Sequence, residues 1–304
     1  MTNQLVLVTG AAGGQQGQTG RHVSEMLLAR GAPVRAFVHR IDERSDRLRA
    51  LGAELVEGDF LYPVQDGLLD ATATMAVAAR NAGVSRLVDL VMLRSSADAP
   101  TPRMRQNYLS EQVFEWAGIA AAHVRAAVFY ENLRALVRLS LSTQDAIRLP
   151  FGSDSTVIPL VSAEDVARVA VGLLTSRTAP AGAGYRVIGA VLTLRDIIAT
   201  FGAVLGRDVR YKAVSDEEWR RGALARASIR MRSSILWRFF RTAGLDPESG
   251  GYAITDTIEI REAENVRGFR APGAQRLDGA SGPGSGLKRR KLSASEEPCI
   301  DRCP

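Results

Sequence analysis

The stretch QLVLVTGAAGGQQGQTG, Gln4–Gly20, decides how this chain of 304 residues folds. Residues 5–9 are apolar or β-branched, which is typical of a short buried strand, and a turn dense in glycine follows them. Residues 21–30 carry apolar side chains at helical spacing and end before Gly31, a residue type that commonly stops a helix. Residues 34–38 again have the composition of a strand. The order of strand, glycine turn, helix and strand predicts the opening βαβ unit of a dinucleotide-binding fold.

The glycines of this turn have a physical reason to be there. A pyrophosphate binds at a helix N-terminus, where free N–H groups and the helix dipole favour negative charge, and glycine lets the backbone approach the phosphates closely. We place the end of the strand at Gly10 and the helix-opening glycine at Gly20, so the turn is longer than the usual fingerprint. Gly14, Gly17 and Gly20 satisfy one glycine spacing, while Gly10, Gly13 and Gly17 form another. Either set could hold the phosphates, so all five glycines are candidate cofactor-binding residues.

Composition indicates a globular protein and excludes several classes. Hydrophobic residues make up 46% of the chain and charged residues 24%, and no apolar stretch approaches the ~18 residues of a membrane-spanning helix. The chain starts with a strand instead of a charged segment before an apolar run, so we expect no signal peptide. Cys299 and Cys303 are the only cysteines, and both lie in the last residues. We therefore expect a cytoplasmic protein with neither a disulfide framework nor a metal site.

The net charge of +6 admits two interpretations. Much of it comes from arginines spread over expected helices and from the cluster of residues 288–291 near the end of the chain. A basic balance can serve nucleic-acid binding, but no recognition motif accompanies it. We favour solvated arginine surfaces and an affinity for an anionic cofactor. The expected partner is a small-molecule substrate, without a membrane or direct nucleic-acid contact. A protein partner remains open, as does the choice between monomer and homodimer.

The residues after the second strand bear on the choice of cofactor. An acidic residue there would bind the ribose 2′-hydroxyl of NAD, whereas a basic residue accommodates the 2′-phosphate of NADP. Arg40 stands where the acid would be, although Asp42 is close by. We therefore predict that Arg40 binds NADP(H), with NAD(H) as the less favoured cofactor. Arg44 and Arg47 follow closely and could also meet the phosphate, but they could equally form an exposed face of the next helix.

Several stretches, taken in order, resemble the NmrA-like group of atypical short-chain dehydrogenase/reductases. The group includes NAD(P)H-dependent quinone reductases, isoflavone-reductase-like enzymes and redox-sensing regulators. No single motif is specific, but their order along residues 4–260 is. The matching stretches are VTGAAG at 8–13, LLARG at 27–31, VRAFVHR at 34–40, GD at 58–59, SEQVFEWAGI at 110–119, HVR at 123–125, FYENL at 129–133 and AEDVA at 163–167.

The resemblance implies an α/β fold: a Rossmann-like, doubly wound parallel sheet with a small C-terminal α+β lobe over the substrate. We expect residues 1–190 to form the NAD(P)-binding domain, with residues 145–165 contributing to the small lobe. Residues 191–267 would complete that lobe. Residues 268–304, which are rich in glycine, serine and charge, are predicted to be a disordered tail.

The chain departs from the group after the third strand. In the group a helix and a fourth strand separate the Gly-Asp pair from a Tyr-Pro loop, whereas here Asp59 is followed almost at once by Tyr62 and Pro63. A crossover to a parallel strand needs about a dozen residues or more. Either one strand–helix unit is missing after Asp59, or the third strand continues into the loop. The resemblance places Asp59 near the adenine, and Tyr62 and Pro63 near the nicotinamide. The alternative for Tyr62 and Pro63 is a plain loop.

The usual proton donor of short-chain dehydrogenases is absent. Those enzymes use Tyr-x-x-x-Lys on a helix, but Tyr108 is followed four residues later by Gln112, and the resemblance aligns Arg103 with the tyrosine and Asn107 with the lysine. Tyr108 is a candidate catalytic residue, with helix packing as the favoured alternative. Ser95 and Ser96 follow a predicted strand at 86–93, so either could face the nicotinamide, and we take Ser95 as the second candidate. The alternative for both is a polar loop. Quinone-type acceptors can take their proton from water, so the missing pair does not exclude reduction.

Two further features concern the substrate side. Phe129 and Asn132 resemble residues that border the substrate pocket in the group. Residues 147–160 are predicted to form a hairpin that turns at Gly152.

Two hypotheses about function follow. The first is an NADP(H)-dependent oxidoreductase that reduces a small electrophilic acceptor such as a quinone. The second is a non-catalytic NAD(P)-binding redox sensor that acts through a protein partner. A third, weaker interpretation is a relative that has lost cofactor binding together with its missing strand.

Overall fold

The structure is a computed structural model that describes residues 4–13, 18–58, 67–141, 146–176, 183–215, 217–219 and 221. The chain divides into two units, Met1–Arg270 and Ala271–Pro304, and all described residues belong to the first. No helix in these ranges is long and apolar enough to cross a membrane. The domain boundaries expected at residues 190 and 267 stay predictions.

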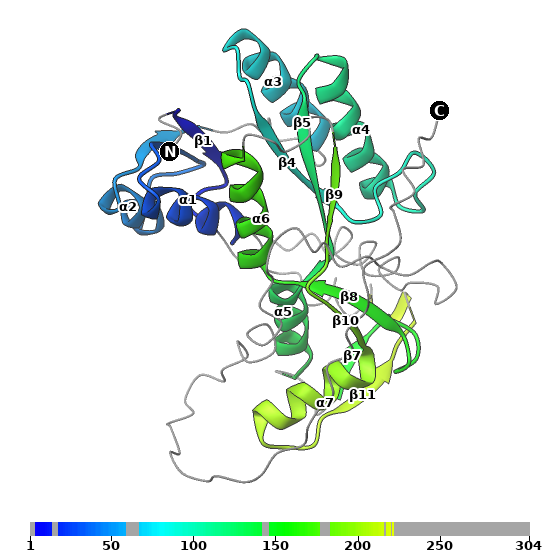
Figure 1. Ribbon diagram of the computed structural model, residues 1–304. Coiled ribbons are helices and arrows are strands. Elements are labelled where there is room, and N and C mark those ends of the chain that lie inside the picture. The colour runs from blue at the N-terminus through cyan, green and yellow to red at the C-terminus, as the bar shows by residue number, and fades with distance from the viewer. Residues whose placement is uncertain are drawn as a thin grey trace, which may run out of the picture. The chain divides into compact units, whose positions relative to one another are not determined.

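The N-terminal part is a three-stranded parallel sheet with helices in its crossovers (Figure 1). The strand order is β1-β2-β3, and Val8 of β1 lies opposite Ala36 of β2. Both side chains are buried, as the apolar, β-branched composition predicts. The elements are β1 (Val6–Thr9), α1 (Thr19–Ala29), β2 (Val34–Val38), α2 (Glu43–Ala50) and β3 (Glu54–Glu57).

A second parallel sheet follows, with the strand order β4-β5-β9. Helices α3 and α4 pack against each other, and the Thr72 and Ser110 hydroxyl groups are hydrogen-bonded between them at 2.9 Å. The elements are α3 (Leu68–Asn81), β4 (Leu87–Met92), α4 (Pro102–Trp116), β5 (Ala121–Ala126) and β9 (Gly184–Val187). The α/β fold with parallel strands that the sequence predicts is therefore confirmed.

The two parallel sheets are not joined by hydrogen bonds among the described strands. β1 and β4 each form the edge of a sheet, and their side chains Leu7 and Leu90 are 48% and 44% exposed. The chain passes from the end of β3 at Glu57 to the start of α3 at Leu68, which leaves no room for a further strand–helix unit. This is the arrangement expected when one such unit is missing after the third strand.

The remaining elements form a smaller α+β region. Its two sheets have the orders β10-β8-β6 and β11-β7, and their core contains Ile147, Leu149, Leu160 and Leu194. Its elements are β6 (Val128–Phe129), α5 (Tyr130–Leu141), β7 (Ala146–Leu149), β8 (Val157–Val161), β10 (Ala190–Thr193), α7 (Leu194–Leu205) and β11 (Arg210–Ala213). One further helix, α6 (Ala163–Thr175), instead packs against α1 and the parallel strands β4 and β5.

The predicted hairpin over residues 147–160 is wrong. The chain does turn near Gly152, whose φ of 77° lies in the left-handed region, but β7 and β8 do not pair with each other. β7 pairs in parallel with β11, and β8 pairs with β10 and β6. Both strands bury nearly every apolar side chain, and each pairs with strands from outside this segment. Burial of these apolar faces, rather than nearness in the chain, sets the pairing.

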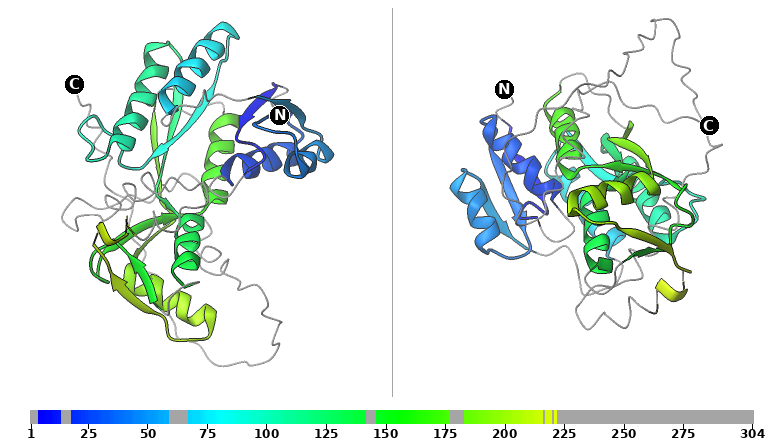
Figure 2. Two further views of the ribbon diagram at one scale, coloured as in Figure 1. Left: turned by 180° about the vertical axis from the view of Figure 1, so that it is seen from behind. Right: turned by 90° about the horizontal axis from the view of Figure 1, so that it is seen from below.

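Helix α6 packs against α1, the first helix of the N-terminal sheet. It lies beside α1 in both Figure 1 and Figure 2. Ala167, Ala170 and Val171 of α6 share one buried cluster with Val23 and Leu27 of α1. The small alanine side chains allow the close approach of the two helices. Helix α1 is thus packed in place by a helix that follows it by more than a hundred residues.

Candidate cofactor and substrate site

The glycine turn closes tightly between β1 and α1. Gly10 and Gly13 have φ angles of 62° and 69°, which favour glycine, and the Gly13 N–H donates to the Gly10 carbonyl at 3.1 Å. A Cβ atom on Gly20 would lie 2.6 Å from the Gly10 oxygen and 2.8 Å from that of Thr9. Position 20 therefore accepts only glycine while α1 keeps this place against the strand.

The start of α1 is suited to an anion. Its N-cap residue, Gln18, makes no side-chain capping hydrogen bond, and the first turn contains no acidic residue. The first N–H groups of the helix thus remain for an outside acceptor. A turn with glycines at positions 10 and 13 beside an uncapped helix start fits the pyrophosphate of a dinucleotide. Gly14 and Gly17, which were predicted to take part, lie outside the described residues.

Arg44 connects helix α2 to the glycine turn. Its Nη1 donates to the Gly13 carbonyl at 3.2 Å, while its Nη2 and Nε donate to Asp42 Oδ2 at 2.6 and 3.0 Å. Asp42 also caps α2 by accepting from the Arg44 and Ser45 N–H groups. The hydrogen bonds from Arg44 hold the pKa of the Asp42 carboxyl below its usual range. Asp42 is already engaged, which disfavours it as a ligand of the ribose hydroxyl, while Arg40 is exposed just beyond β2.

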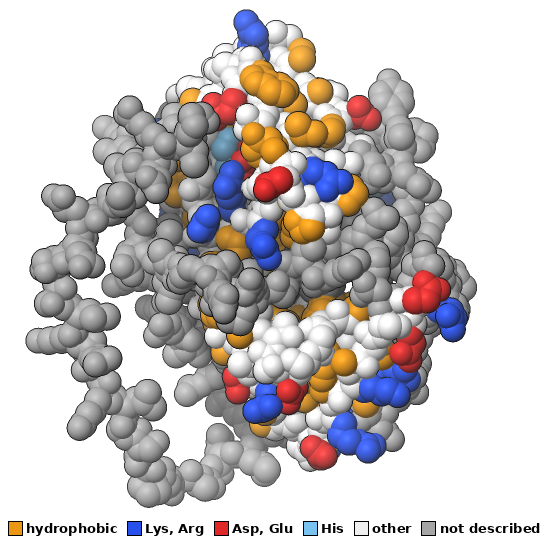
Figure 3. All heavy atoms as spheres, turned by 90° about the vertical axis from the view of Figure 1, so that its right-hand side faces the viewer, with side chains coloured by type: hydrophobic (Ala, Val, Ile, Leu, Met, Phe, Trp, Pro, Cys, Tyr) orange, Lys and Arg blue, Asp and Glu red, His pale blue; other side chains and the backbone are white. Residues whose placement is uncertain are grey.

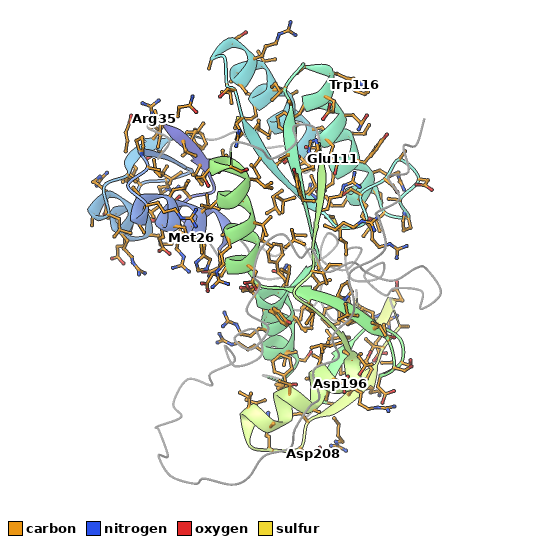
Figure 4. All side chains as sticks on the ribbon, in the orientation of Figure 1. Met26, Arg35, Glu111, Trp116, Asp196 and Asp208 are labelled. Atoms are coloured by element: carbon orange, nitrogen blue, oxygen red, sulfur yellow. The ribbon has the colours of Figure 1, made fainter. Side chains whose placement is uncertain are left out.

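A row of polar contacts ties α4 to the strands beneath it. Asn107 Oδ1 accepts from the Met92 N–H at 3.2 Å, at the end of β4. One turn further, Glu111 Oε1 and Oε2 accept from Arg125 Nε and Nη2 at 2.9 and 2.6 Å. Figure 4 shows Glu111 between α4 and the strands. The side chain of Glu111 is only 4% exposed, so the carboxylate of this two-point ion pair is buried.

His123 and two carboxylates form the last contact of this row. Its Nε2 lies 3.5 Å from Glu115 Oε1, and its Nδ1 lies 3.5 Å from Asp89 Oδ2. Burial opposes the charged imidazole, but the carboxylates of Asp89, Glu111 and Glu115 outweigh it and raise the pKa of His123.

This raised pKa predicts a stability that depends on pH. In the unfolded chain the pKa of His123 is about 6.5, and in the folded protein it is higher. Charged His123 therefore contributes fully to the free energy of unfolding below about pH 6.5, and this contribution is lost as the pH rises through the folded pKa. We therefore expect the difference in unfolding free energy between wild type and His123→Gln to be larger at about pH 6 than at about pH 8. Urea unfolding at both pH values measures it, and equal differences would contradict the assignment.

The two candidate catalytic residues lie at the C-terminal end of β4 and on α4. Ser95 is buried, and its hydroxyl donates to the Met92 carbonyl at 2.7 Å, so it stabilises the turn that follows the strand. Tyr108 is half-buried on α4, beside the buried Asn107. Asn107, which aligns with the usual lysine, spans from the Met92 N–H to the Arg103 carbonyl. Its amide joins strand and helix by neutral hydrogen bonds.

The predicted pocket residues Phe129 and Asn132 are half-buried and flank Tyr130 where α5 begins. Tyr130 is buried, and burial, followed by the charges of Asp165 and Glu131, raises its pKa to about 12. The phenol therefore stays protonated near neutral pH. Glu131 Oε1 accepts from the Ala163 N–H at 3.1 Å, which joins the start of α5 to the start of α6.

Three other predicted site residues, Asp59, Tyr62 and Pro63, lie outside the described residues. Sequence reasoning missed the Glu111–Arg125 pair and the role of Arg44 at the glycine turn. The first had a signal: Asn107, Glu111 and Glu115 recur every fourth residue on a helix, opposite the alternating polar pair His123 and Arg125 on a strand. No group of His, Cys, Asp or Glu in the described ranges could hold a metal ion.

The outer face of α4 carries apolar side chains. Trp116, labelled in Figure 4, is 73% exposed, and Leu109 is 39% exposed. Figure 3 shows hydrophobic side chains grouped on the upper part of this face, with Lys and Arg side chains close by. The oligomeric state stays a prediction.

Comparison with known proteins gives the family. Residues 64–240, more than half of the chain, match the NmrA-like family. The chain therefore belongs to the NmrA-like family, which confirms the resemblance seen in its motifs.

Two curated relatives are reductases. A (4-alkanoyl-5-oxo-2,5-dihydrofuran-3-yl)methyl phosphate reductase from Streptomyces griseus is 29% identical over 287 residues, which cover 88% of this chain and 95% of that protein. An NAD(P)H azoreductase from Xenophilus azovorans is 24% identical over 70% of this chain and 78% of its own length.

Two solved structures share the fold. Triphenylmethane reductase from Citrobacter sp., complexed with NADP(H), has a TM-score of 0.66 at 19% identity and covers 87% of this chain and 94% of its own. The NADPH-dependent quinone oxidoreductase of Escherichia coli, complexed with NADPH, has a TM-score of 0.67 at 18% identity and covers 87% and 95%.

Proposed function

We propose that this protein is an NADPH-dependent oxidoreductase that reduces a small electrophilic acceptor. The observation that carries the proposal is the tight contact of Gly20 with the Thr9 and Gly10 carbonyls, which holds an uncapped helix start at the end of β1. The reductase names of the curated relatives support the reaction class, and the NADP(H) and NADPH complexes of two structural neighbours support the cofactor.

The chain's own residues would bind and orient the dinucleotide. The N–H groups at the start of α1 would hold the pyrophosphate near Gly10 and Gly13, and Arg40 would bind the 2′-phosphate. Asp59, Tyr62 and Pro63 would complete the cofactor site, with Gly14 and Gly17 in the turn. When bound, NADPH supplies a hydride to the acceptor. Phe129 and Asn132 would border the acceptor, and Ser95 and Tyr108 are the candidate hydroxyl groups.

The experiment that tests this function is a titration of NADPH and NADH by fluorescence, followed by turnover assays with quinones and conjugated lactones. The conjugated lactone represents the substrate class in the name of the Streptomyces griseus relative. Tight NADPH binding with acceptor turnover supports the proposal. Binding without turnover would instead favour a cofactor-binding sensor that acts through a protein partner. Absence of binding would contradict both functions.

Replacing Arg40 with alanine is expected to weaken NADPH binding by about tenfold or more, since one charge-assisted hydrogen bond to the 2′-phosphate is worth about 1.5 kcal/mol or more. NADH lacks that phosphate, so its affinity should stay unchanged. Titration of both cofactors measures the ratio of the two affinities. Arg49→Ala is the matched control, because Arg49 is an exposed arginine of α2 that pairs with Asp46. An unchanged ratio in Arg40→Ala would show that another residue selects the cofactor.

A further inference from the structure

The polar row between α4 and the sheet sets a register from which the place of Arg103 follows. Glu115 pairs with His123, and Glu111 pairs with Arg125, so a step of four helix residues matches a step of two strand residues. The two distances agree, at about 6 Å along the helix and about 6.6 Å along the strand. Asn107 continues the row at Met92, the last residue of β4.

One turn before Asn107, Arg103 occupies the next position of this row. Positions 103, 107, 111 and 115 lie on one side of a helix, and 107 and 111 are buried against the strands. Met92 and Ala126 are the last paired residues of β4 and β5. Arg103 therefore lies past the C-terminal ends of these strands, where open α/β sheets bind their ligands. It is half-buried there.

The charge of the surrounding segment is positive. Arg94 and Arg105 accompany Arg103 between the end of β4 and the first turns of α4, against Asp98 as the acidic residue of that stretch. Arg105 is exposed on another side of the helix and donates to the Ala99 carbonyl at 2.6 Å. Arg103 is thus the arginine of α4 that continues the row toward the ligand edge.

We propose that Arg103 is a catalytic residue that stabilises an oxyanion on the acceptor, and that the acceptors are therefore carbonyl-conjugated alkenes and quinones. This inference rests on the proposed function. A guanidinium cation does not give up its proton near neutral pH, so it cannot replace the missing tyrosine as an acid. It can stabilise negative charge that develops on a carbonyl oxygen.

The reaction that needs such a group is conjugate reduction. The β carbon of the acceptor gains the hydride with its electron pair from NADPH, and the π electrons move onto the carbonyl oxygen. Arg103 stabilises the resulting enolate. Water then supplies a proton to the α carbon, or to oxygen in a quinone, and the acceptor is reduced by two electrons while NADPH is oxidised to NADP⁺. Reduction of an isolated ketone to an alcohol would need a proton at the oxygen during the hydride step, which this arginine does not provide.

The test uses binding as well as rate. Tetronate, the conjugate base of 4-hydroxy-2(5H)-furanone, is a stable anion that mimics a cyclic enolate. We expect Arg103→Gln to lower kcat/KM for a conjugated lactone by about 100-fold, the effect of removing one oxyanion-stabilising donor. Tetronate affinity, measured by calorimetry with NADP⁺ present, should fall by about tenfold. NADPH affinity should stay unchanged, and Arg103→Lys should recover part of both losses.

Arg105→Gln is the matched control, since it removes the same charge from the same helix on another side and should leave both readouts unchanged. Equal tetronate affinity in wild type and Arg103→Gln would overturn the assignment of Arg103, as would a wild type that does not bind tetronate. These outcomes differ from a failure of the proposed function, in which the wild type would not bind NADPH or would reduce no acceptor.

Discussion

Replacing Gly20 with alanine is expected to abolish measurable binding of both NADPH and NADH. The added Cβ would lie 2.6 Å and 2.8 Å from two backbone oxygens, and a backbone cannot move aside as a flexible side chain can. Helix α1 would have to shift away from β1, which would misplace the N–H groups at its start. The same overpacking should lower the free energy of unfolding by about 1–3 kcal/mol. Fluorescence titration measures the first effect, and urea unfolding measures the second.

Gly118→Ala is the control for this prediction. Gly118 has a φ of 71° and open space around it, so alanine adds backbone strain of about 1 kcal/mol or more without touching the cofactor site. We expect that variant to be less stable but to bind NADPH as the wild type does. Normal cofactor binding by Gly20→Ala would show that the pyrophosphate does not bind at the start of α1.

Replacing Arg125 with methionine is expected to destabilise the protein by about 3 kcal/mol. The change leaves the buried carboxylate of Glu111 without its two-point partner, and breaking a buried pair from one side typically has an effect of this size. The low end of the usual range is appropriate because the Arg125 side chain is 27% exposed. The free energy of unfolding in urea measures the effect.

The double variant Glu111→Met and Arg125→Met is the decisive comparison. Removing both charges leaves no unpaired group, so most of the lost stability should return. Arg35→Met serves as a control, because Arg35 forms an ion pair with Glu54 in which both side chains are well exposed, and we expect a change below about 1 kcal/mol. A double variant as unstable as the single one would show that packing, and not charge, dominates at this contact.

The elements that depend on local pattern were predictable from the sequence. The β1–α1–β2 unit follows from a short apolar run, a glycine turn and helical spacing, and the caps at Ser162 and Thr193 follow from residue type. The strands that pair with β7 and with β8 were not predictable in this way. Their partners come from other parts of the chain, and a strand carries no local signal that names its neighbour.

The residues of the candidate site also fall into two groups: those that local sequence predicts and those that depend on tertiary packing. The glycines and Arg40 can be recognised because their roles depend on backbone conformation and position after a strand. Arg44 could not be assigned to the glycine turn, since its contact with Gly13 spans 31 residues and depends on how α2 packs. The absence of a Tyr-x-x-x-Lys pair was visible in the sequence, whereas the place of Arg103 required the register between α4 and β5.

The packing of α6 on α1 has a consequence for the chain during its synthesis. The buried cluster that α1 shares with Ala167, Ala170 and Val171 cannot close until α6 has left the ribosome, roughly 130 residues after α1. At ~5–20 residues per second, that delay is on the order of ten seconds. During this interval Val23 and Leu27 lack the cover that α6 supplies in the folded protein, so part of their apolar surface is open to a chaperone.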